Sequence, residues 1–502
     1  MTPSQSSDFN APEFAAVNTT LSSTFRTYPK SNRMSDYNSL LTQLFEIVGP
    51  GGVLTAAVDT APYLTDWRRR LTGSALCVVS PRDSAQVAAV VRACADARLP
   101  MVPQGGNTGL CGGATPDASG RAVVISLRRM NRVRAIDTDN NTITVEAGCV
   151  LSEVQRAAQT AGRLFPLSLA AEGSCQIGGN LSTNAGGVHV MRYGNTRDLT
   201  LGLEVVLPDG RVWEGLRALR KDNTGYDLKQ LFIGAEGTLG LITAAVLKLY
   251  PLPSAQAVAW IGLRNPGDAV VLLNAAQQRF GTRLTAFELI SHTPLEFVFK
   301  HIPGCQRPLS QDLPWYVLLE LYDNDESVRE QMVEFLAGEI DAARVVDGAI
   351  AHSAEQVKRL WSLREHLPEA QTREGYSIKH DISVPVSRVA EFIERGKVLL
   401  EGMIDGIRLT PFGHLGDGNL HYNVSRPVYW TDTQFAAETP RINTVVHDLV
   451  HDLGGSVSAE HGLGQVKRDE ARRYKSEVEM DLMRAVKRAL DPAGLMNPGK
   501  VL

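Results

Sequence analysis

Segments with the apolar spacing of strands and of helices follow one another along residues 75–250. The stretch "ALCVVSP" is typical of a buried strand, and "SAQVAAVVRACADARL" after it repeats apolar residues at helical spacing. Strands are expected again in "AVVISL" and "NTITVEAG", followed by a helix in "LSEVQRAAQTAG". In "LEVVLPDGRVWE", Pro-Asp-Gly between two alternating segments predicts a β-hairpin. "LKQLFIGAEGTLGLITAAVLKLYP" predicts a short helix, a glycine-rich turn and a closing strand, and Pro251 and Pro253 then mark a boundary.

A second set of elements follows that boundary. "AVAWIGL" and "WYVLLELY" predict strands, and helices are predicted around 267–280, 325–337, 354–374 and 386–402. Polar residues alternate with apolar ones in "SIKHDISV" (377–384), which predicts one strand, and the chain from 434 onward is mostly helical. We therefore expect an α+β protein divided into a tail at 1–33, a first domain at 34–253, a second at 254–433 and a C-terminal helical segment at 434–502.

Composition narrows the class of protein. The chain of 502 residues is 43% hydrophobic and 21% charged, as is usual for a globular protein, and its net charge of −4 gives no electrostatic reason to bind nucleic acid or an anionic membrane. No segment has the apolar length needed to cross a bilayer. Six scattered cysteines without a CxxC pair argue against an iron–sulfur cluster or a disulfide scaffold and favour the cytoplasm. The first 33 residues lack the apolar core of a secretory signal, so we expect a disordered tail there.

Three glycine-rich loops lie beside predicted strand ends: "VPQGGNTGLCGG" (102–113), "AAEGSCQIGGNLSTNAGG" (170–187) and "GAEGTLG" (234–240). Consecutive glycines let backbone N–H groups approach an anionic ligand closely. The first loop is not a Walker loop, because no Gly-Lys-Ser/Thr follows, and no G-x-G-x-x-G supports a Rossmann site. Each loop alone is also compatible with an ordinary turn. Three in one domain favour a large cofactor that carries phosphate.

"GHLGDGNLHYN" (413–423) concentrates polar side chains around glycines. On one continuous strand the odd spacing of His414 and His421 would place them on opposite faces, and the GDG break removes this restriction. Alternation after the break puts His421 and Asn423 on one face. "SAEHGLGQ" adds Glu460 and His461 with a flexible backbone, and two His with one Glu is a common set of Zn²⁺ ligands. The alternative is a group of hydrogen-bonded structural histidines, and spacing alone leaves both open.

The segments "PQGGNTGL", "GGNLSTNAGG", "RYGNTRD" and "FIGAEGTLGLIT" resemble the FAD-binding domain of the vanillyl-alcohol oxidase/p-cresol methylhydroxylase (PCMH) superfamily, over about 40–502. The resemblance implies a PCMH-type domain of two α/β subdomains, a cap domain with an antiparallel sheet and a C-terminal segment that returns to the FAD site. Some members bind FAD covalently through a histidine in the first loop, but here Asn107 and Thr108 stand there, so we expect non-covalent FAD. The residues implied for the cofactor are Pro103, Gln104, Gly105, Gly106, Asn107, Thr108, Gly109, Leu110, Glu172, Gly173, Ser174, Gly178, Gly179, Asn180, Thr183, Asn184, Gly187, Gly194, Glu236, Gly237, Gly240, Ile242 and Asn497.

Within that superfamily, "GHLGDGNLHYN" and "AEHGLG" resemble the metal-dependent D-2-hydroxyacid dehydrogenases. The resemblance implies that a divalent metal, expected to be Zn²⁺, is bound by three ligands, and that a histidine next to one of them is both the catalytic base and a substrate contact. It also implies that the substrate is held by an asparagine, an arginine and a lysine. In this chain the ligands are His414, His421 and Glu460, the base is His461, and the substrate residues are Arg364, Lys379 and Asn423.

The chain departs from that pattern at Pro368, where family members commonly carry Ser or Thr one helical turn after the arginine. The missing hydroxyl weakens the case for D-2-hydroxyglutarate and strengthens that for a shorter acid such as D-malate or D-lactate. D-2-hydroxyglutarate remains the favoured substrate, and D-malate, D-lactate and glycolate are the alternatives. The resemblance also implies an external electron acceptor, namely an electron-transfer flavoprotein or a quinone, and a homodimer. Three other classes stay open: a zinc hydrolase, which would show no flavin spectrum; a non-redox flavin transferase; and a flavin-binding protein, in which His461→Ala would change nothing.

Overall fold

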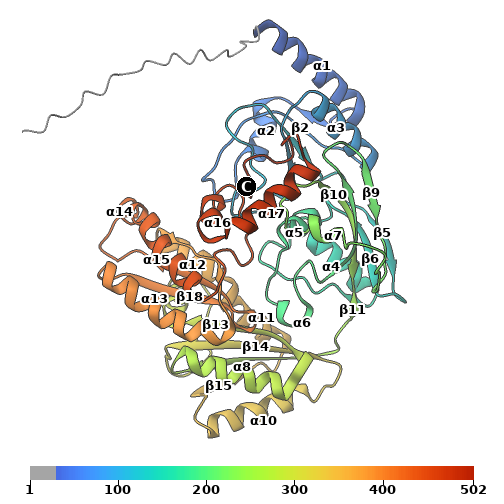
Figure 1. Ribbon diagram of the computed structural model, residues 1–502. Helices are drawn as coiled ribbons and strands as arrows, with labels where there is room; N and C mark the ends of the chain where they lie inside the picture. The colour runs from blue at the N-terminus through green and yellow to red at the C-terminus, as the bar shows by residue number, and fades with distance from the viewer. Residues whose placement is uncertain (1–29) are drawn as a thin grey trace, which may run out of the picture.

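The computed structural model describes residues 30–502. Nearly all of the tail expected at 1–33 lies outside the described residues, and helix α1 (Lys30–Val48) begins at Lys30. In Figure 1 the blue-to-green first half of the chain lies beside the yellow-to-orange second half, and the red helices α16 (Arg468–Tyr474) and α17 (Glu477–Leu490) pack near the first half. None of the helices within 30–502 combines the length and the apolar character that a membrane span requires.

The first sheet has four strands in the order β1-β2-β4-β3, and β2, β4 and β3 run parallel. Helix α3 (Ser84–Asp96) follows β2, and the Asp83 side chain caps its first turn by accepting from the N–H of Gln86. The strands are β1 (Val53–Leu54), β2 (Ala75–Val79), β3 (Met101–Gln104) and β4 (Ala122–Ser126), with helix α2 (Ala57–Leu64) between β1 and β2. Because β3 ends at Gln104, its carboxyl end carries the glycine loop that begins at Gly105.

The second sheet is antiparallel, in the order β5-β6-β10-β8-β9. The predicted hairpin and the predicted closing strand are confirmed, since β8 pairs with both β9 and β10. Its strands are β5 (Val133–Asp137), β6 (Thr142–Glu146), β8 (Thr200–Val206), β9 (Val212–Gly215) and β10 (Leu241–Lys248). Helices α4 (Leu151–Thr160), α5 (Ile177–Thr183), α6 (Val190–Tyr193) and α7 (Lys229–Phe232) and the short pair β7 (Arg163–Leu164) and β11 (Tyr250–Pro251) complete this part.

The third sheet has the order β15-β12-β14-β13-β18-β19-β16, and every pairing in it is antiparallel, as expected. Apolar side chains are buried on both of its faces, which explains unbroken apolar runs such as "AVAWIGL". The strands are β12 (Ala255–Leu263), β13 (Leu284–Ser291), β14 (Trp315–Asp323), β15 (Asp347–Ile350), β16 (Ser377–Ile378), β17 (Ile382–Ser383), β18 (Arg408–His414) and β19 (Asn419–Ser425).

Helices cover both faces of this sheet. One face packs on α8 (Pro266–Phe280), α10 (Val328–Asp341), α13 (Val389–Met403), α14 (Asp432–Ala437) and α15 (Thr439–Asp452). The other face packs on α9 (His292–His301), α11 (Ala354–Glu365) and α12 (Leu367–Arg373). The second face also bears the polar residues of the candidate site.

Two predicted elements of this region are wrong in detail. The single helix expected at 354–374 is two helices that meet at His366, and Pro368 lies in the first turn of α12, where proline is tolerated. The strand expected at 377–384 is split into β16 and β17. The ladder is interrupted because the N–H of His380 donates to the side chain of Asn423 at 3.1 Å instead of to a strand carbonyl.

The C-terminal segment returns to the first sheet. Met101 and Met496 form a parallel bridge, and the N–H of Asn497 donates to the carbonyl of Met101 at 2.8 Å. The side chain of Asn497 donates to the carbonyls of Gly113 and Glu236 at 2.9 and 2.7 Å. The end of the chain therefore joins two of the three glycine-rich loops.

Candidate active site

The β18–β19 hairpin brings His414 and His421 to one face of the third sheet. Phe412 lies opposite His421 in the register, and His414, two residues further along β18, shares the face of Phe412. We expected the GDG break to change the register within one strand. Instead, the chain reverses there through a 3-10 turn at Leu415–Asp417. Gly418 closes this turn at φ +80°, where a side chain would be strained and a Cβ would meet the carbonyl oxygen of Val384.

The three expected metal ligands come together. His414, His421 and Glu460 each offer one ligand atom, and these atoms all lie within 4.8 Å of one another. The Nε2 atom of His414 lies 3.7 Å from Oε1 of Glu460, which the loop between α15 and α16 supplies. Gly186 makes room for this carboxylate, since a Cβ there would be 2.9 Å from Oε1. The donor set, two imidazoles and one carboxylate, suits a catalytic Zn²⁺ with an open position.

A buried glutamate that the sequence reasoning missed fixes the first of these ligands. Glu288 on β13 accepts from Nδ1 of His414 at 2.6 Å and from Nε of Arg364 at 2.7 Å. Burial by itself would raise the pKa of Glu288, but the adjacent cations lower it to about 2. With Nδ1 bonded to Glu288, Nε2 is the His414 nitrogen that faces Glu460. Glu288 also leaves the rest of the Arg364 guanidinium, which lies over the Phe412 ring, to bind an anion.

His461 is oriented by Asp381, another residue that the sequence reasoning did not assign to the site. The Nδ1 atom of His461 lies 3.1 Å from Oδ2 of Asp381, and the same oxygen accepts the backbone N–H groups of Glu460 and His461. Burial lowers the pKa of His461 to about 4, so the imidazole is neutral near pH 7. This contact leaves Nε2 of His461 free to accept a proton, and its ring lies 6.0 Å from that of His421.

The expected substrate residue Asn423 is held on both sides. Its Oδ1 accepts from the N–H of His380, and its Nδ2 donates to Oε1 of Gln371 at 3.0 Å. Gln371 is fully buried on α12, and its Nε2 has no hydrogen-bond partner among the described residues. Pro368 is exposed on the same helix. The buried polar position of α12 therefore belongs to Gln371, not to Pro368.

The remaining expected substrate residue, Lys379, lies in the break between β16 and β17. Burial, together with the smaller effects of Arg68 and Arg70, lowers the pKa of its ammonium group to about 8. No carboxylate of the described side chains lies within ion-pair distance of Lys379, in contrast to Lys467, which lies 3.9 Å from Asp381. Lys379 is therefore available to an anionic ligand.

The glycine-rich loops form a cradle next to these residues. Gly106 packs so closely on the second loop that a Cβ would lie 2.1 Å from the carbonyl oxygen of Ser174. Asn107, Asn184 and Glu236 adopt left-handed backbone conformations with φ between 50° and 53°. The carboxylate of Glu236 accepts the N–H groups of Leu463 and Gly464 at 2.7 and 2.8 Å. The third loop thus supports the segment that carries His461.

The cradle suits a flavin dinucleotide. A Cβ at Gly109, Gly173 or Gly179 would meet no atom within 4 Å, so backbone at these positions faces open space. Side-chain oxygens of Gln176, Asn180, Asn195 and Asn497 are buried and have no partner among the described residues. A cofactor with ring N–H, amino and hydroxyl groups would satisfy such oxygens, and glycine N–H groups would bind its pyrophosphate. The side chain of Ile242, in contrast, packs in the core, so only its backbone is available to a cofactor.

Sequence reasoning missed three residues of the site, namely Glu288, Asp381 and Gln371. Only Glu288 could have been recognised from its sequence context. Glu288 is a charged residue in the middle of the apolar segment "LTAFELIS", and a carboxylate in a buried strand requires a partner. Asp381 looked like one of several alternating polar residues, and Gln371 like part of a helix surface. Neither pattern distinguishes a buried polar residue from an exposed one.

Comparisons with known proteins identify matching domains and relatives of this chain. The family model of the FAD binding domain matches residues 75–215, and that of the FAD linked oxidases, C-terminal domain, matches residues 252–501. The mitochondrial D-2-hydroxyglutarate dehydrogenase of Bos taurus is 40% identical over 91% of this chain and 82% of its own length. The D-2-hydroxyglutarate dehydrogenase of Xanthomonas citri pv. viticola is 38% identical over 89% of this chain and 93% of its own.

Solved structures with the same fold are more distant in sequence. The structure of p-cresol methylhydroxylase with substrate bound superimposes with a TM-score of 0.71 at 17% identity, covering 93% of this chain and 97% of that one. An alkyldihydroxyacetonephosphate synthase gives a TM-score of 0.68 at 16% identity, covering 92% and 84%. These two likenesses establish the fold alone, and they confirm the expected α+β class. Together with the sequence relatives and the matched domains, they show that this chain belongs to the FAD-linked oxidases and dehydrogenases of the p-cresol methylhydroxylase fold.

Proposed function

We propose that the protein oxidises a D-2-hydroxy acid, with D-2-hydroxyglutarate favoured, to the 2-oxo acid in a reaction that depends on FAD and on a divalent metal. One observation carries the proposal: the ligand atoms of His414, His421 and Glu460 converge within 4.8 Å, and the Asp381-bound His461 adjoins them. The named activity of the curated relatives supports the same substrate class.

Each residue has a defined task in this proposal. His461 accepts the proton of the 2-hydroxyl group at Nε2, and Asp381 holds Nδ1 so that the imidazole keeps this orientation. Asn423, fixed by Gln371 and His380, contacts the substrate. Arg364, whose Nε is bonded to Glu288, binds carboxylate with its remaining N–H groups, and Lys379 adds a second cation.

His414, His421 and Glu460 would hold the metal, and the three glycine-rich loops would hold FAD. When bound, the metal lowers the pKa of a coordinated hydroxyl group, and FAD provides the acceptor for the two electrons. An external acceptor, for which an electron-transfer flavoprotein or a quinone is expected, completes the cycle.

Several finer expectations belong to the same proposal. They are zinc as the metal, FAD held without a covalent bond, a homodimer, a cytoplasmic location and domain limits at 33, 253 and 433. D-malate, D-lactate and glycolate are the alternative substrates. The absence of histidine from the 105–110 loop supports non-covalent FAD, and the His, His, Glu donor set supports zinc.

The test is anaerobic mixing of the FAD-loaded protein with D- and L-2-hydroxy acids while the oxidised-flavin absorbance is followed. We expect D-2-hydroxyglutarate to bleach the flavin and its L-enantiomer not to do so. Complete metal removal should slow the bleaching by about 100-fold or more, roughly 3 kcal/mol of transition-state stabilisation, and added Zn²⁺ should restore it. If no 2-hydroxy acid reduces the flavin, the proposal is wrong. If bleaching survives metal removal, only the role of the metal is wrong.

A further inference from the structure

A tight loop at residues 66–71 of the FAD-binding part projects toward the candidate site. The buried carboxylate of Asp66 organises it by accepting the backbone N–H groups of Arg68, Arg70 and Leu71 at 3.1, 2.7 and 2.6 Å. An isolated bridge between Thr65 and Thr72 closes its base. A loop held by this many hydrogen bonds presents its side chains from a fixed backbone.

The loop lies between the cofactor cradle and the segment that carries His461. The side chain of Asn107 in the first glycine-rich loop donates to the carbonyl of Thr65 at 2.9 Å. Leu71 packs on Gly112, which is also the carbonyl partner of Gln465 four residues after His461. On the opposite side, the Arg70 guanidinium lies 5.6 Å from the ring centroid of Tyr376, three residues before Lys379. The loop therefore faces the end of the site where Lys379 lies.

Three cations meet there without a partner. Among the side chains that the structure describes, no carboxylate lies within ion-pair distance of the Arg68 guanidinium, the Arg70 guanidinium or the Lys379 ammonium group. They are nevertheless close enough to interact, since both arginines lower the pKa of Lys379, and Arg68 lowers that of His461, in addition to the larger effect of burial. The other charges of the site are paired: Arg364 with Glu288, and Lys467 with Asp381.

We infer that Arg68 and Arg70 are specificity-determining residues that, together with Lys379, bind a negatively charged group at the far end of the substrate. This inference rests on the proposed function, and it assigns to the loop at 66–71 a role in choosing among 2-hydroxy acids. Arg68 and Lys379 are partly buried, whereas Arg70 is exposed and lies over the Tyr376 ring beside them. Partly buried cations without a counter-ion are stabilised by an anionic ligand, and a ligand with a neutral far end leaves them unpaired. The loop therefore selects for a second carboxylate and against monocarboxylates such as D-lactate and glycolate.

The experiment compares Arg68→Gln and Arg70→Gln with the FAD-loaded wild type. For each protein, kcat and KM are measured with D-2-hydroxyglutarate and with D-lactate and a dye acceptor, and the binding of 2-oxoglutarate and of pyruvate is measured by calorimetry. We expect each variant to lose about 10- to 100-fold in kcat/KM for D-2-hydroxyglutarate, mainly through KM, as for a lost hydrogen bond to a charged group. Turnover of D-lactate should stay unchanged.

Arg69→Gln is the matched control, because Arg69 belongs to the same loop but, unlike Arg68 and Arg70, is not among the charges that lower the pKa of Lys379. Arg68→Lys, which retains the charge, should recover part of the preference, and unchanged flavin content and melting temperature would show that the loop is intact. An equal fall for both acids, or no change in their ratio, overturns the inference. If no hydroxy acid reduces the flavin, the proposed function is wrong, and calorimetry alone then tests the anion site. Weaker binding of 2-oxoglutarate by Arg68→Gln but not by Arg69→Gln would support the site. Equal binding by the two variants would overturn it.

Discussion

At the scale of single residues, the site depends on buried carboxylates that hold its histidines and its arginine in place. Glu288 has no exposed surface, and its two oxygens are bonded to His414 and Arg364. It therefore links one proposed metal ligand with one proposed substrate residue. Asp381 performs the same task for His461. Such carboxylates fix which ring nitrogen of a histidine faces the metal or the substrate.

Glu288→Gln should weaken metal binding. The amide keeps the shape of the side chain but loses the charge that holds Nδ1 of His414, so we expect the Zn²⁺ affinity to fall by about 10- to 100-fold. Competition with a chromophoric chelator measures it. Glu320→Gln is the control, because Glu320 is equally buried on the neighbouring strand β14 and accepts from Gln256 and Trp361 at 2.7 and 3.0 Å. Equal Zn²⁺ affinities of Glu288→Gln and the wild type would disprove the role of Glu288.

At the scale of elements, Glu374 joins three parts of the second domain. It caps the end of α12, accepts from Arg408 of β18 at 2.6 Å and also pairs with Lys300 and His301 of α9. Burial would raise its pKa, but the hydrogen bonds from Arg408, Lys300 and His301 lower it to about 2 from its ordinary value of 4.5. The helix that carries Gln371 is thereby fastened to the sheet that carries His414.

Glu374→Gln should destabilise the protein in a pH-dependent way. Because the folded state lowers the pKa of this carboxyl, its stabilisation is complete above about pH 4.5 and is lost as the pH falls from 4.5 toward 2. We expect a loss of about 2 kcal/mol at pH 7, measured by urea unfolding, that shrinks as the pH is lowered through this range. Glu369→Gln is the control, because its pair with Arg373 is exposed and contributes at most about 0.5 kcal/mol. A loss for Glu374→Gln that does not change between pH 7 and pH 3 would contradict the assignment.

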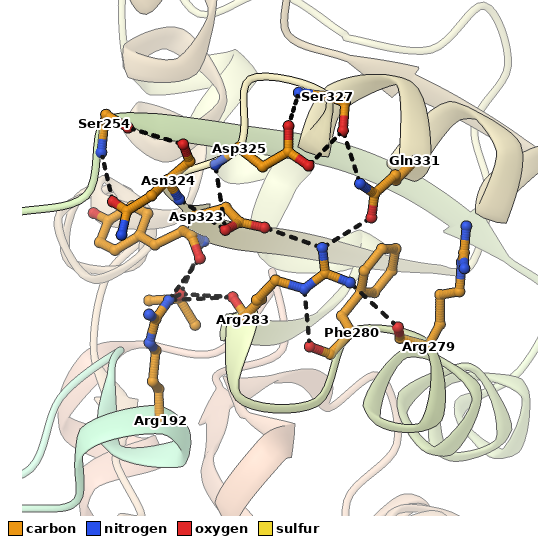
Figure 2. Close-up of polar contacts among 12 residues, drawn as sticks. Arg192, Ser254, Arg279, Phe280, Arg283, Asp323, Asn324, Asp325, Ser327 and Gln331 are labelled. Carbon is orange, nitrogen blue, oxygen red and sulfur yellow. Dashed lines mark hydrogen bonds and ion pairs between the residues drawn. The ribbon is translucent and has the colours of Figure 1, made fainter.

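At the scale of the whole molecule, short polar contacts join the FAD-binding part to the third sheet. Figure 2 shows Arg192 of α6 reaching toward Arg283 and its neighbours, with the Asp323, Asn324 and Asp325 turn beside them. The Arg192 guanidinium donates to the carbonyl of Tyr322, the hydroxyl of Thr285 and the carbonyl of Arg283 at 2.8, 3.1 and 3.4 Å. These hydrogen bonds hold the FAD-binding part against the third sheet, and with them the cofactor cradle next to the candidate metal site.

Arg192→Gln should loosen this junction. Loss of a charged donor to three acceptors is expected to cost about 1.5–3 kcal/mol and to speed amide hydrogen exchange in α6, β13 and β14. Hydrogen–deuterium exchange with mass spectrometry measures the effect. Arg279→Gln is the control, since the Arg279 side chain pairs, among the described side chains, only with Glu334, at 3.4 Å and at an exposed position. If exchange at the junction is equally slow in both variants, Arg192 does not hold the two parts together.

The sequence by itself determined the order of the elements, the glycine-rich loops and the chemical types at the site, because apolar periodicity and glycine content are local properties. Its local pattern predicted the β8–β9 hairpin, and its resemblance to a known family implied the antiparallel third sheet and the grouping of His414, His421 and Glu460. It failed at His366, where a new helix begins and Pro368 in its first turn has no N–H to continue the previous one, and in the segment 379–381, where the Asn423 side chain replaced a backbone acceptor.

Only the tertiary structure decided which polar residues face the site. Glu288 reaches His414 across 126 positions of the chain, and Asp381 reaches the N–H of His461 across 80. Arg68 approaches Lys379 from another part of the molecule. A carboxylate or an arginine looks alike in sequence whether it is solvated or buried, because its role depends on desolvation and on partners that folding brings close.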